Sequence, residues 1–120
     1  MGTKRLEVKE VGDITLVTFV DKHIVDEVSI QIIGEQLLGI VDEVRRRNIL
    51  LDFGQVEFIS SPVLGKLIAL QKKLQTVEGH LALCNLNSDI YEVFIRTSLE
   101  SFFDIQRGKK DNGSEAESGV

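Results

Sequence analysis

The sequence predicts a single α/β domain, in which amphipathic helices cover a mixed, largely parallel β-sheet. Short runs rich in apolar and β-branched residues alternate along the chain with longer segments whose apolar residues recur every three or four positions. Parallel strands need crossover connections, which are usually helices, so this alternation favours a sheet with parallel strands. A chain of 120 residues without internal repeats has the length of one domain.

A hairpin is expected at the start of the domain. Residues 6–10 alternate apolar and charged side chains, and residues 14–20 are rich in β-branched residues. Gly12 and Asp13 lie between these two runs, where they favour a tight turn. The first two strands are therefore predicted to pair directly.

The first helix is expected to begin after Asp26, which is the best candidate for its N-cap, with Glu27 in the first turn. Its last turn would carry Arg45, Arg46 and Arg47, whose positive charge suits a helix C-terminus better than it indicates a phosphate site. The spacing of its apolar residues predicts one buried stripe, made of Ile30, Ile33, Leu37, Ile40, Val41 and Val44.

A strand, with an extended run after it, and a second helix are predicted next. Residues 48–53 form a nearly continuous apolar run, which is typical of a central strand covered on both faces. After Gly54 and Gln55, residues 56–59 form a further extended run. The second helix is expected from Pro62 to about Val77, with Gly79 as its stop signal. Its inward positions are Val63, Leu64, Leu67, Ile68, Leu70 or Gln71, Leu74 and Val77.

The remaining elements are short. Residues 81–84 are predicted to form a buried strand, and Asn87 or Ser88 to cap a third helix with Ile90, Val93 and Phe94 facing inward. Residues 102–105 would form the last strand. The predicted order is thus strand, strand, helix, strand, helix, strand, helix, strand, in a domain that spans residues 1–106. Residues 107–120 are charged and lack periodicity, so they are predicted to be a disordered tail.

Composition excludes several classes of function. The net charge of −5 is opposite to that expected of a protein that binds nucleic acid. No apolar run is long enough to cross a membrane, and no secretory signal follows the basic N-terminus. A single cysteine, Cys84, fits a reducing cytoplasm.

Residues that could support catalysis are few and separate. His23 and His80 are the only histidines, and no metal-binding, phosphate-loop or nucleophile-elbow motif accompanies them. Cys84 lies in an apolar run with no base nearby in the sequence. The sequence therefore predicts neither an enzyme nor a site for a metal or cofactor.

The stretch from Ser60 to Gly65 combines two serines with the only proline, between a strand and a helix. Pro62 has a backbone angle suited to the first helical position. Ser61 would then be the N-cap, with its hydroxyl accepting from a helix amide. The local chemistry is compatible with a purely structural cap, but a phosphate would also be tolerated at this position.

The same stretch resembles the motif of the STAS domain of bacterial anti-sigma-factor antagonists. Phe58, Ile59, Ser61, Leu64 and Gly65 match the motif, and the resemblance extends over residues 6–105. Three positions depart from the family pattern: the change at 60 removes a negative charge beside the acceptor, and the changes at 62 and 63 make the loop stiffer and bulkier. Ser60 replaces an aspartate, Pro62 replaces the second serine, and Val63 replaces the first glycine.

The resemblance implies a protein-binding module that phosphorylation switches. Its partner would be an anti-sigma factor that also acts as a serine protein kinase, and a serine phosphatase is a further partner to consider. Ser61 would be the phosphoacceptor, with Ser60 as the less favoured alternative. The expected partner surface comprises Ser60, Ser61, Pro62, Val63, Leu64, Lys66 and Lys73. An alternative is an adaptor subunit without a switch, in a transport or signalling assembly. A nucleotide-binding or catalytic role is the least favoured of the three hypotheses.

Overall fold

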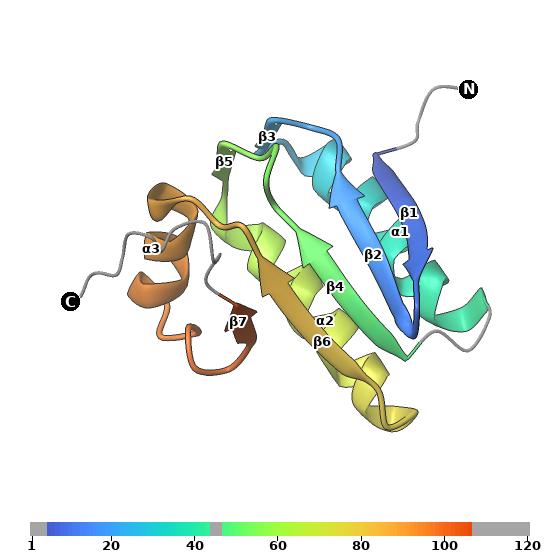
Figure 1. The fold of residues 1–120 in the computed structure, drawn as a ribbon. Helices are drawn as coiled ribbons and strands as arrows, with labels where there is room; N and C mark the ends of the chain where they lie inside the picture. The colour runs from blue at the N-terminus through green and yellow to red at the C-terminus, as the bar shows by residue number, and fades with distance from the viewer. Residues whose placement is uncertain (1–4, 44–46, 107–120) are drawn as a thin grey trace.

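The computed structural model describes residues 5–43 and 47–106. Seven strands and three helices follow one another in the described chain (Figure 1). They are β1 (Leu6–Val11), β2 (Ile14–Phe19), β3 (His23–Ile24), α1 (Glu27–Glu43), β4 (Asn48–Asp52), β5 (Phe58–Ile59), α2 (Ser61–Thr76), β6 (His80–Cys84), α3 (Ser88–Arg96) and β7 (Asp104–Gln106).

The main sheet has five strands in the order β1-β2-β4-β6-β7. Strands β1 and β2 pair antiparallel around Gly12 and Asp13, as predicted, and Gly12 has a φ of 64°. The other neighbours in this sheet are parallel. The predicted mixed, largely parallel sheet is therefore confirmed.

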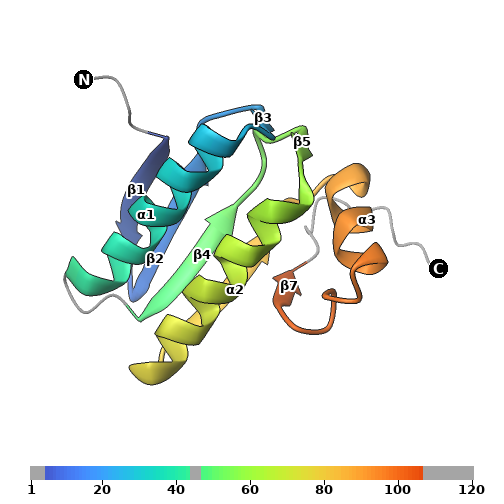
Figure 2. The same ribbon diagram turned by 180° about the vertical axis from the view of Figure 1, so that it is seen from behind.

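Both long helices lie on one face of this sheet, and no helix of the described residues covers the other face (Figures 1 and 2). The reason is topological: β2, β4, β6 and β7 follow one another in a single direction across the sheet. Crossovers of the usual right hand then all fall on the same side. The prediction that residues 48–53 are covered on both faces was wrong, since Ile49 and Leu51 are buried but Leu50 is partly exposed.

The buried stripes of the helices agree closely with the spacing of apolar residues. Every stripe residue of α1 that the structure describes is buried, whereas Val44 lies outside the described residues. In α2 the alternative at positions 70 and 71 resolves to Leu70, which is fully buried. Val77 was wrongly placed in the core: it follows the last helical residue and is 36% exposed.

Two helix ends differ from expectation. Helix α1 ends at Glu43, so Arg47 lies beyond it, and Arg45 and Arg46 lie outside the described residues. At the end of α2, the residue with positive φ is Glu78, at 59°, rather than Gly79. Gly79 donates to the Leu74 carbonyl at 2.7 Å, and a Cβ at Gly79 would lie 2.5 Å from the Arg47 oxygen. Glycine is therefore needed here for close packing against the chain that leads into β4.

Strand predictions failed mainly where strands are very short. The pair β3–β5 forms a separate two-stranded sheet, and β3 had not been predicted. The last strand, β7, begins at Asp104, two residues later than expected, because Phe103 turns into the core and is only 5% exposed. The predicted tail, 107–120, lies outside the described residues.

Asp26 caps α1 as predicted, by accepting from the Ser29 amide at 2.9 Å. The backbone and side-chain hydrogen bonds from Ser29 hold the pKa of this carboxyl below its usual value of 3.8. The ionised carboxylate therefore stabilises the fold above pH 3.8, and this contribution is lost as the pH falls through the lower folded-state pKa.

Replacing Asp26→Asn should keep an acceptor for the helix amide but remove this titration. We expect the difference in thermal midpoint between the wild type and Asp26→Asn to stay constant near neutral pH. Below pH 3.8, the midpoint of the wild type should fall relative to that of Asp26→Asn. The measurement is thermal unfolding followed by circular dichroism across this range. A difference that stays constant far below that pH would contradict the proposed linkage.

Candidate functional site

The N-terminus of α2 lies at the carboxyl end of the parallel strands, next to the β3–β5 pair (Figure 1). The β3–β5 pairing continues into the helix, because the Ser60 amide donates to the Ile24 carbonyl at 3.1 Å. The Glu57 amide donates to the Lys22 carbonyl at 2.7 Å. These bonds hold the loop before α2 against the loop before α1.

The helix begins one residue earlier than predicted, with Ser60 rather than Ser61 at the N-cap. Ser60 keeps an extended backbone, with φ −105° and ψ 162°, because its amide belongs to the β3–β5 pairing. Its side chain makes no capping hydrogen bond. Instead, the Ser60 Oγ is buried and has no hydrogen-bond partner among residues 5–43 and 47–106.

Ser61 is exposed in the first turn of α2. The prediction that its hydroxyl caps the helix was wrong, since Ser61 is already helical. Of the first backbone amides, that of Ser60 is bonded to Ile24, that of Val63 is bonded to the Ser60 carbonyl at 3.0 Å, and Pro62 has none. Within the described chain, the Ser61 amide is therefore the unbonded donor that this helix end offers to an anion.

Ser60→Ala is expected to increase the free energy of unfolding by about 1 kcal/mol, because it removes a buried hydroxyl that bonds to nothing. Ser61→Ala, at an exposed position, should change stability by less than about 0.5 kcal/mol. Urea unfolding of both variants measures these values. A loss of about 1 kcal/mol in Ser60→Ala would instead show that its hydroxyl caps the helix.

Four other residues of the predicted partner surface are buried or are held against α1. Val63 and Leu64 are 2% and 3% exposed, so their side chains belong to the core and are not available to a partner. Lys66 reaches across to α1, where its Nζ lies 3.2 Å from Gln31 Oε1. Lys73 forms an ion pair with Asp42 at 2.8 Å. Both lysines thus lie along the seam between the two helices, whereas Pro62 is exposed beside Ser61.

The periodicity of the sequence did not reveal an apolar rim at this end of the molecule, which we define as Val25, Val28 and Phe58. Their exposed fractions are 46%, 66% and 53%. Val25 follows Ile24 of β3, Val28 lies in the first turn of α1, and Phe58 belongs to β5. Exposed apolar side chains on neighbouring elements are candidates for contact with another protein.

Asn87 holds the loop before the site in place. Its side chain accepts from the Ile90 amide at 2.8 Å, which caps α3 as predicted. The same side chain donates to the carbonyls of Val56 and Glu57, at 3.3 Å and 3.1 Å. The sequence indicated the cap, but the second role requires knowing that α3 packs beside β5.

Other reactive side chains do not converge. His23 lies 3.4 Å from Glu57, and both side chains are 62% exposed. Across residues 5–43 and 47–106, no group of three or more histidine, cysteine or acidic residues could hold a metal ion. In the same ranges, no helix combines the length and apolar character that a membrane crossing requires.

Comparison with known proteins gives the same fold and a family. The model of the STAS domain family matches residues 5–112. A Bordetella bronchiseptica protein named "Putative anti-sigma factor antagonist BtrV" is 30% identical over 87 residues, which cover 72% of this chain and 74% of that protein.

Solved structures of low sequence identity share the fold. The anti-sigma factor antagonist SpoIIAA in its unphosphorylated form superimposes with a TM-score of 0.73 at 15% identity, over 96% of this chain and 97% of that one. An anti-sigma-factor antagonist (STAS) domain protein from Planctomyces limnophilus gives 0.76 at 21% identity, over 88% and 92%. The phosphorylated form of the Bacillus protein SpoIIAA gives 0.64 at 14% identity, over 92% and 97%.

The chain belongs to the STAS domain family and, within it, to the anti-sigma factor antagonists. This membership confirms the resemblance inferred from Phe58, Ile59, Ser61, Leu64 and Gly65. It also confirms that the protein is a regulatory module and not an enzyme.

Proposed function

We propose that this protein binds an anti-sigma factor that is also a serine kinase, and that phosphorylation of Ser61 releases this partner. The observation that supports the proposal best is an exposed serine in the first turn of α2, next to the exposed Pro62 and close to the apolar rim. A serine phosphatase would restore binding. The proposed location is the cytoplasm, in keeping with a sequence that holds one cysteine.

Burial distinguishes the two candidate acceptors. A kinase must reach the hydroxyl of its substrate, and the Ser60 Oγ is enclosed by the protein. Ser61 is exposed, so its hydroxyl can be phosphorylated without unfolding of the helix. The geometry therefore favours Ser61 over Ser60.

The proposed switch acts through the surface rather than through the fold. A phosphoserine carries about −1.5 to −2 charges, which the N-terminus of a helix tolerates. With Pro62 lacking an N–H and the Val63 amide already bonded, the Ser61 amide is the donor left for this charge, so hydrogen bonds within α2 would neutralise only part of it. An added charge of this size would then face the partner among apolar side chains, where burial is costly.

The proposed partner surface extends along α2 from Ser61 and Pro62 to Gly65 and Ala69, which are all exposed. These side chains are small and uncharged, so a partner could approach the helix backbone closely. Lys66 and Lys73, already held against α1, would lie at the border of this surface.

Gly65→Ala tests the close approach. A Cβ at Gly65 meets no atom within 4 Å in the free protein, and the same is true of Gly39 in α1. Each substitution by alanine should raise the free energy of unfolding by about 0.5–1 kcal/mol, because glycine is unfavourable inside a helix. We expect Gly65→Ala to weaken partner binding and Gly39→Ala to leave it unchanged, as measured by calorimetric titration. Equal affinities of the two variants would place the interface elsewhere.

The test of the function is incubation with the partner kinase and ATP, followed by mapping of the phosphorylated residue by mass spectrometry. We expect one phosphate, on Ser61, and none in Ser61→Ala. Ser60→Ala should be phosphorylated like the wild type. Modification confined to Ser60, or binding of a kinase that leaves the protein unmodified, would contradict the proposal and favour the adaptor alternative.

A further inference from the structure

The sheet face that no described helix covers, called the open face below, carries apolar side chains (Figure 1). Along each strand, the residues that alternate with the buried ones point to this face. Its apolar members are Val11, Ile14, Leu16, Leu50, Ala82 and Cys84. A sheet of largely parallel strands usually has both faces covered, so an open face with this composition is a candidate for contact with another chain.

Strand register arranges part of the open face as a row that crosses all five strands. Residues that are partners in neighbouring strands lie side by side on the same face. From β1 to β7, the row consists of Lys9, Leu16, Leu50, Ala82 and Asp104. It therefore has a positive charge at one end, a negative charge at the other, and Leu50 on the middle strand.

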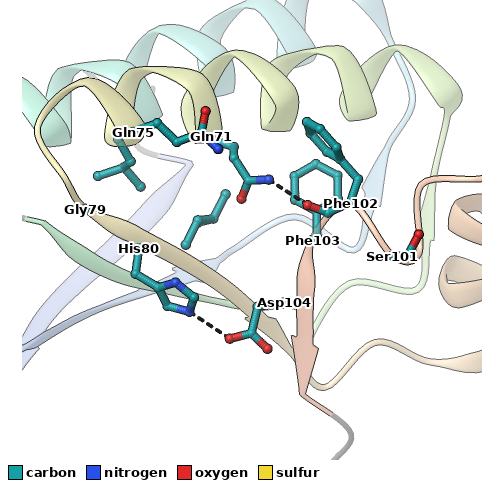
Figure 3. Close-up of a pocket in the computed structure, with 10 residues that line it drawn as sticks. Gln71, Gln75, Gly79, His80, Ser101, Phe102, Phe103 and Asp104 are labelled. Carbon is teal, nitrogen blue, oxygen red and sulfur yellow. Dashed lines mark hydrogen bonds and ion pairs between the residues drawn. The ribbon is translucent and has the colours of Figure 1, made fainter.

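Both charged ends of this row are accessible. Lys9 is exposed, and within residues 5–43 and 47–106 it forms no ion pair. Figure 3 shows His80 and Asp104 on the side of β6 that faces away from Gln71 of α2, with His80 Nε2 2.7 Å from Asp104 Oδ2. An ionised carboxylate can accept several hydrogen bonds, so the contact with His80 orients Asp104 and still allows a lysine to pair with it.

We propose that the open face binds the open face of a second copy of this chain, about a two-fold axis that runs parallel to β4 and passes over Leu50. Because β4 is the middle strand, this axis places β1 of one copy over β7 of the other. The row then meets itself in reverse. Lys9 lies opposite Asp104 of the second copy, and Leu16 lies opposite the smaller Ala82. Packed sheets are about 10 Å apart, a distance that extended lysine and aspartate side chains can bridge.

The size of the open face predicts a weak dimer. Five strands about 4.8 Å apart and about 20 Å long give a footprint of about 400 Å² per copy, whereas a standard interface buries about 800 Å² per partner. The contact uses the side of the sheet opposite α1 and α2, so it does not depend on Ser61 or on the proposed partner.

Asp52 weakens the dimer further. It lies on the open face of β4, two residues beyond Leu50, so the two-fold axis brings it close to Asp52 of the second copy. Within each copy, Asp52 Oδ1 accepts from the Gly54 amide at 2.8 Å and from Asn85 Nδ2 at 2.9 Å. These bonds hold the carboxylate in place, and the two like charges therefore repel each other across the interface.

Sedimentation velocity of the full chain tests the self-association, over concentrations from about 10 µM to about 1 mM, where a small interface should begin to form. We expect the average sedimentation coefficient to rise from that of a monomer towards that of a dimer. Ile14→Glu should keep the chain monomeric, because it places a charge within the apolar part of the open face. Val8→Glu is its matched control: the two residues are 42% and 39% exposed, but Val8 is on the helix side of β1, where it pairs with the buried Val17. Val8→Glu should associate like the wild type.

Exchange of the two charges tests the arrangement of the copies. Lys9→Glu and Asp104→Lys should each weaken association about fivefold or more, and the double variant should restore it, since the pair is then re-formed with its signs reversed. Asp52→Asn should strengthen association about fivefold, because it removes the repulsion and keeps an oxygen that accepts from Gly54. Amide spectra of ¹⁵N-labelled protein check that each variant is folded.

Three results would overturn the proposal. The first is a full chain that stays monomeric at every concentration, which would leave the open face to residues 107–120 or to another protein. The second is a Val8→Glu variant that loses association as Ile14→Glu does. The third is a folded double variant that associates no better than Lys9→Glu alone, or a folded Asp52→Asn variant with unchanged association.

Discussion

Ser61→Asp is expected to weaken binding of the anti-sigma factor by about 30-fold or more, while the protein remains folded. The substitution places a charge on an exposed position that the proposed interface would bury, and an unpaired buried charge costs about 2 kcal/mol or more. An acidic residue in the first turn of a helix is favourable for the helix itself. Calorimetric titration measures the affinity, and thermal unfolding checks that the midpoint is unchanged or raised.

Ser61→Asn is the matched control, because the asparagine side chain has nearly the same size as that of aspartate but carries no charge. Together with Ser61→Ala, it should bind the partner within a few-fold of the wild type. If Ser61→Asn weakens binding as much as Ser61→Asp, the cause is bulk and not charge. If neither variant weakens binding, Ser61 lies outside the interface.

Phe53→Ala should produce the largest loss of stability, about 3–5 kcal/mol. Phe53 follows β4, is fully buried, and packs against Phe19 with a centroid distance of 4.7 Å. Its backbone also donates to the Cys84 carbonyl and accepts from the Val56 amide, both at 3.0 Å, in the turn that leads to β5. Because small domains are stable by only about 5–15 kcal/mol, urea unfolding should show a greatly lowered midpoint.

Phe58→Ala removes the same side chain from a site five residues later, where it is 53% exposed. We expect a loss of stability below about 1 kcal/mol, since most of the ring is already in contact with water. If Phe58 belongs to the partner surface, this variant should weaken binding, whereas its stability should stay near that of the wild type. The reverse result, a large loss of stability with full binding, would contradict the assignment of the apolar rim.

Much of the fold followed from the sequence because helical spacing and turn chemistry were both clear. The stripe from Ile30 to Val41 repeats at helical spacing, and every described member of it is buried. Turn chemistry was equally direct at Gly12 and at Asp26, where a single residue type meets a specific backbone need. These features are local, so they can be recognised without knowing which elements come together.

Features that depend on tertiary packing could not be predicted in the same way. A two-residue strand such as β3 has no alternation to detect, and it exists because His23 and Ile24 pair with Phe58 and Ile59. The apolar run from 48 to 53 could not show that only one sheet face is covered, because that depends on the strand order. The N-cap shifted from Ser61 to Ser60 because the amide of Ser60 is bonded to a distant carbonyl of Ile24.

The candidate site was predicted in part. The motif located Ser60, Ser61 and Pro62 at the start of α2, and the structure agrees with that position. It could not show that Val63 and Leu64 point into the core or that Lys66 and Lys73 contact α1. Nor could it reveal Val25 and Val28, which come near α2 through the pairing of β3 with β5.

The most direct test of the proposed function is the affinity of the partner for protein that is phosphorylated on Ser61 alone, compared with the unmodified protein. Both samples can be prepared from Ser60→Ala, which removes the alternative acceptor and is expected to be stable. We predict tight binding of the unmodified form and a loss of about 30-fold or more on phosphorylation. Equal affinity of the two forms would contradict a switch at Ser61 and would indicate an adaptor that binds its partner constitutively.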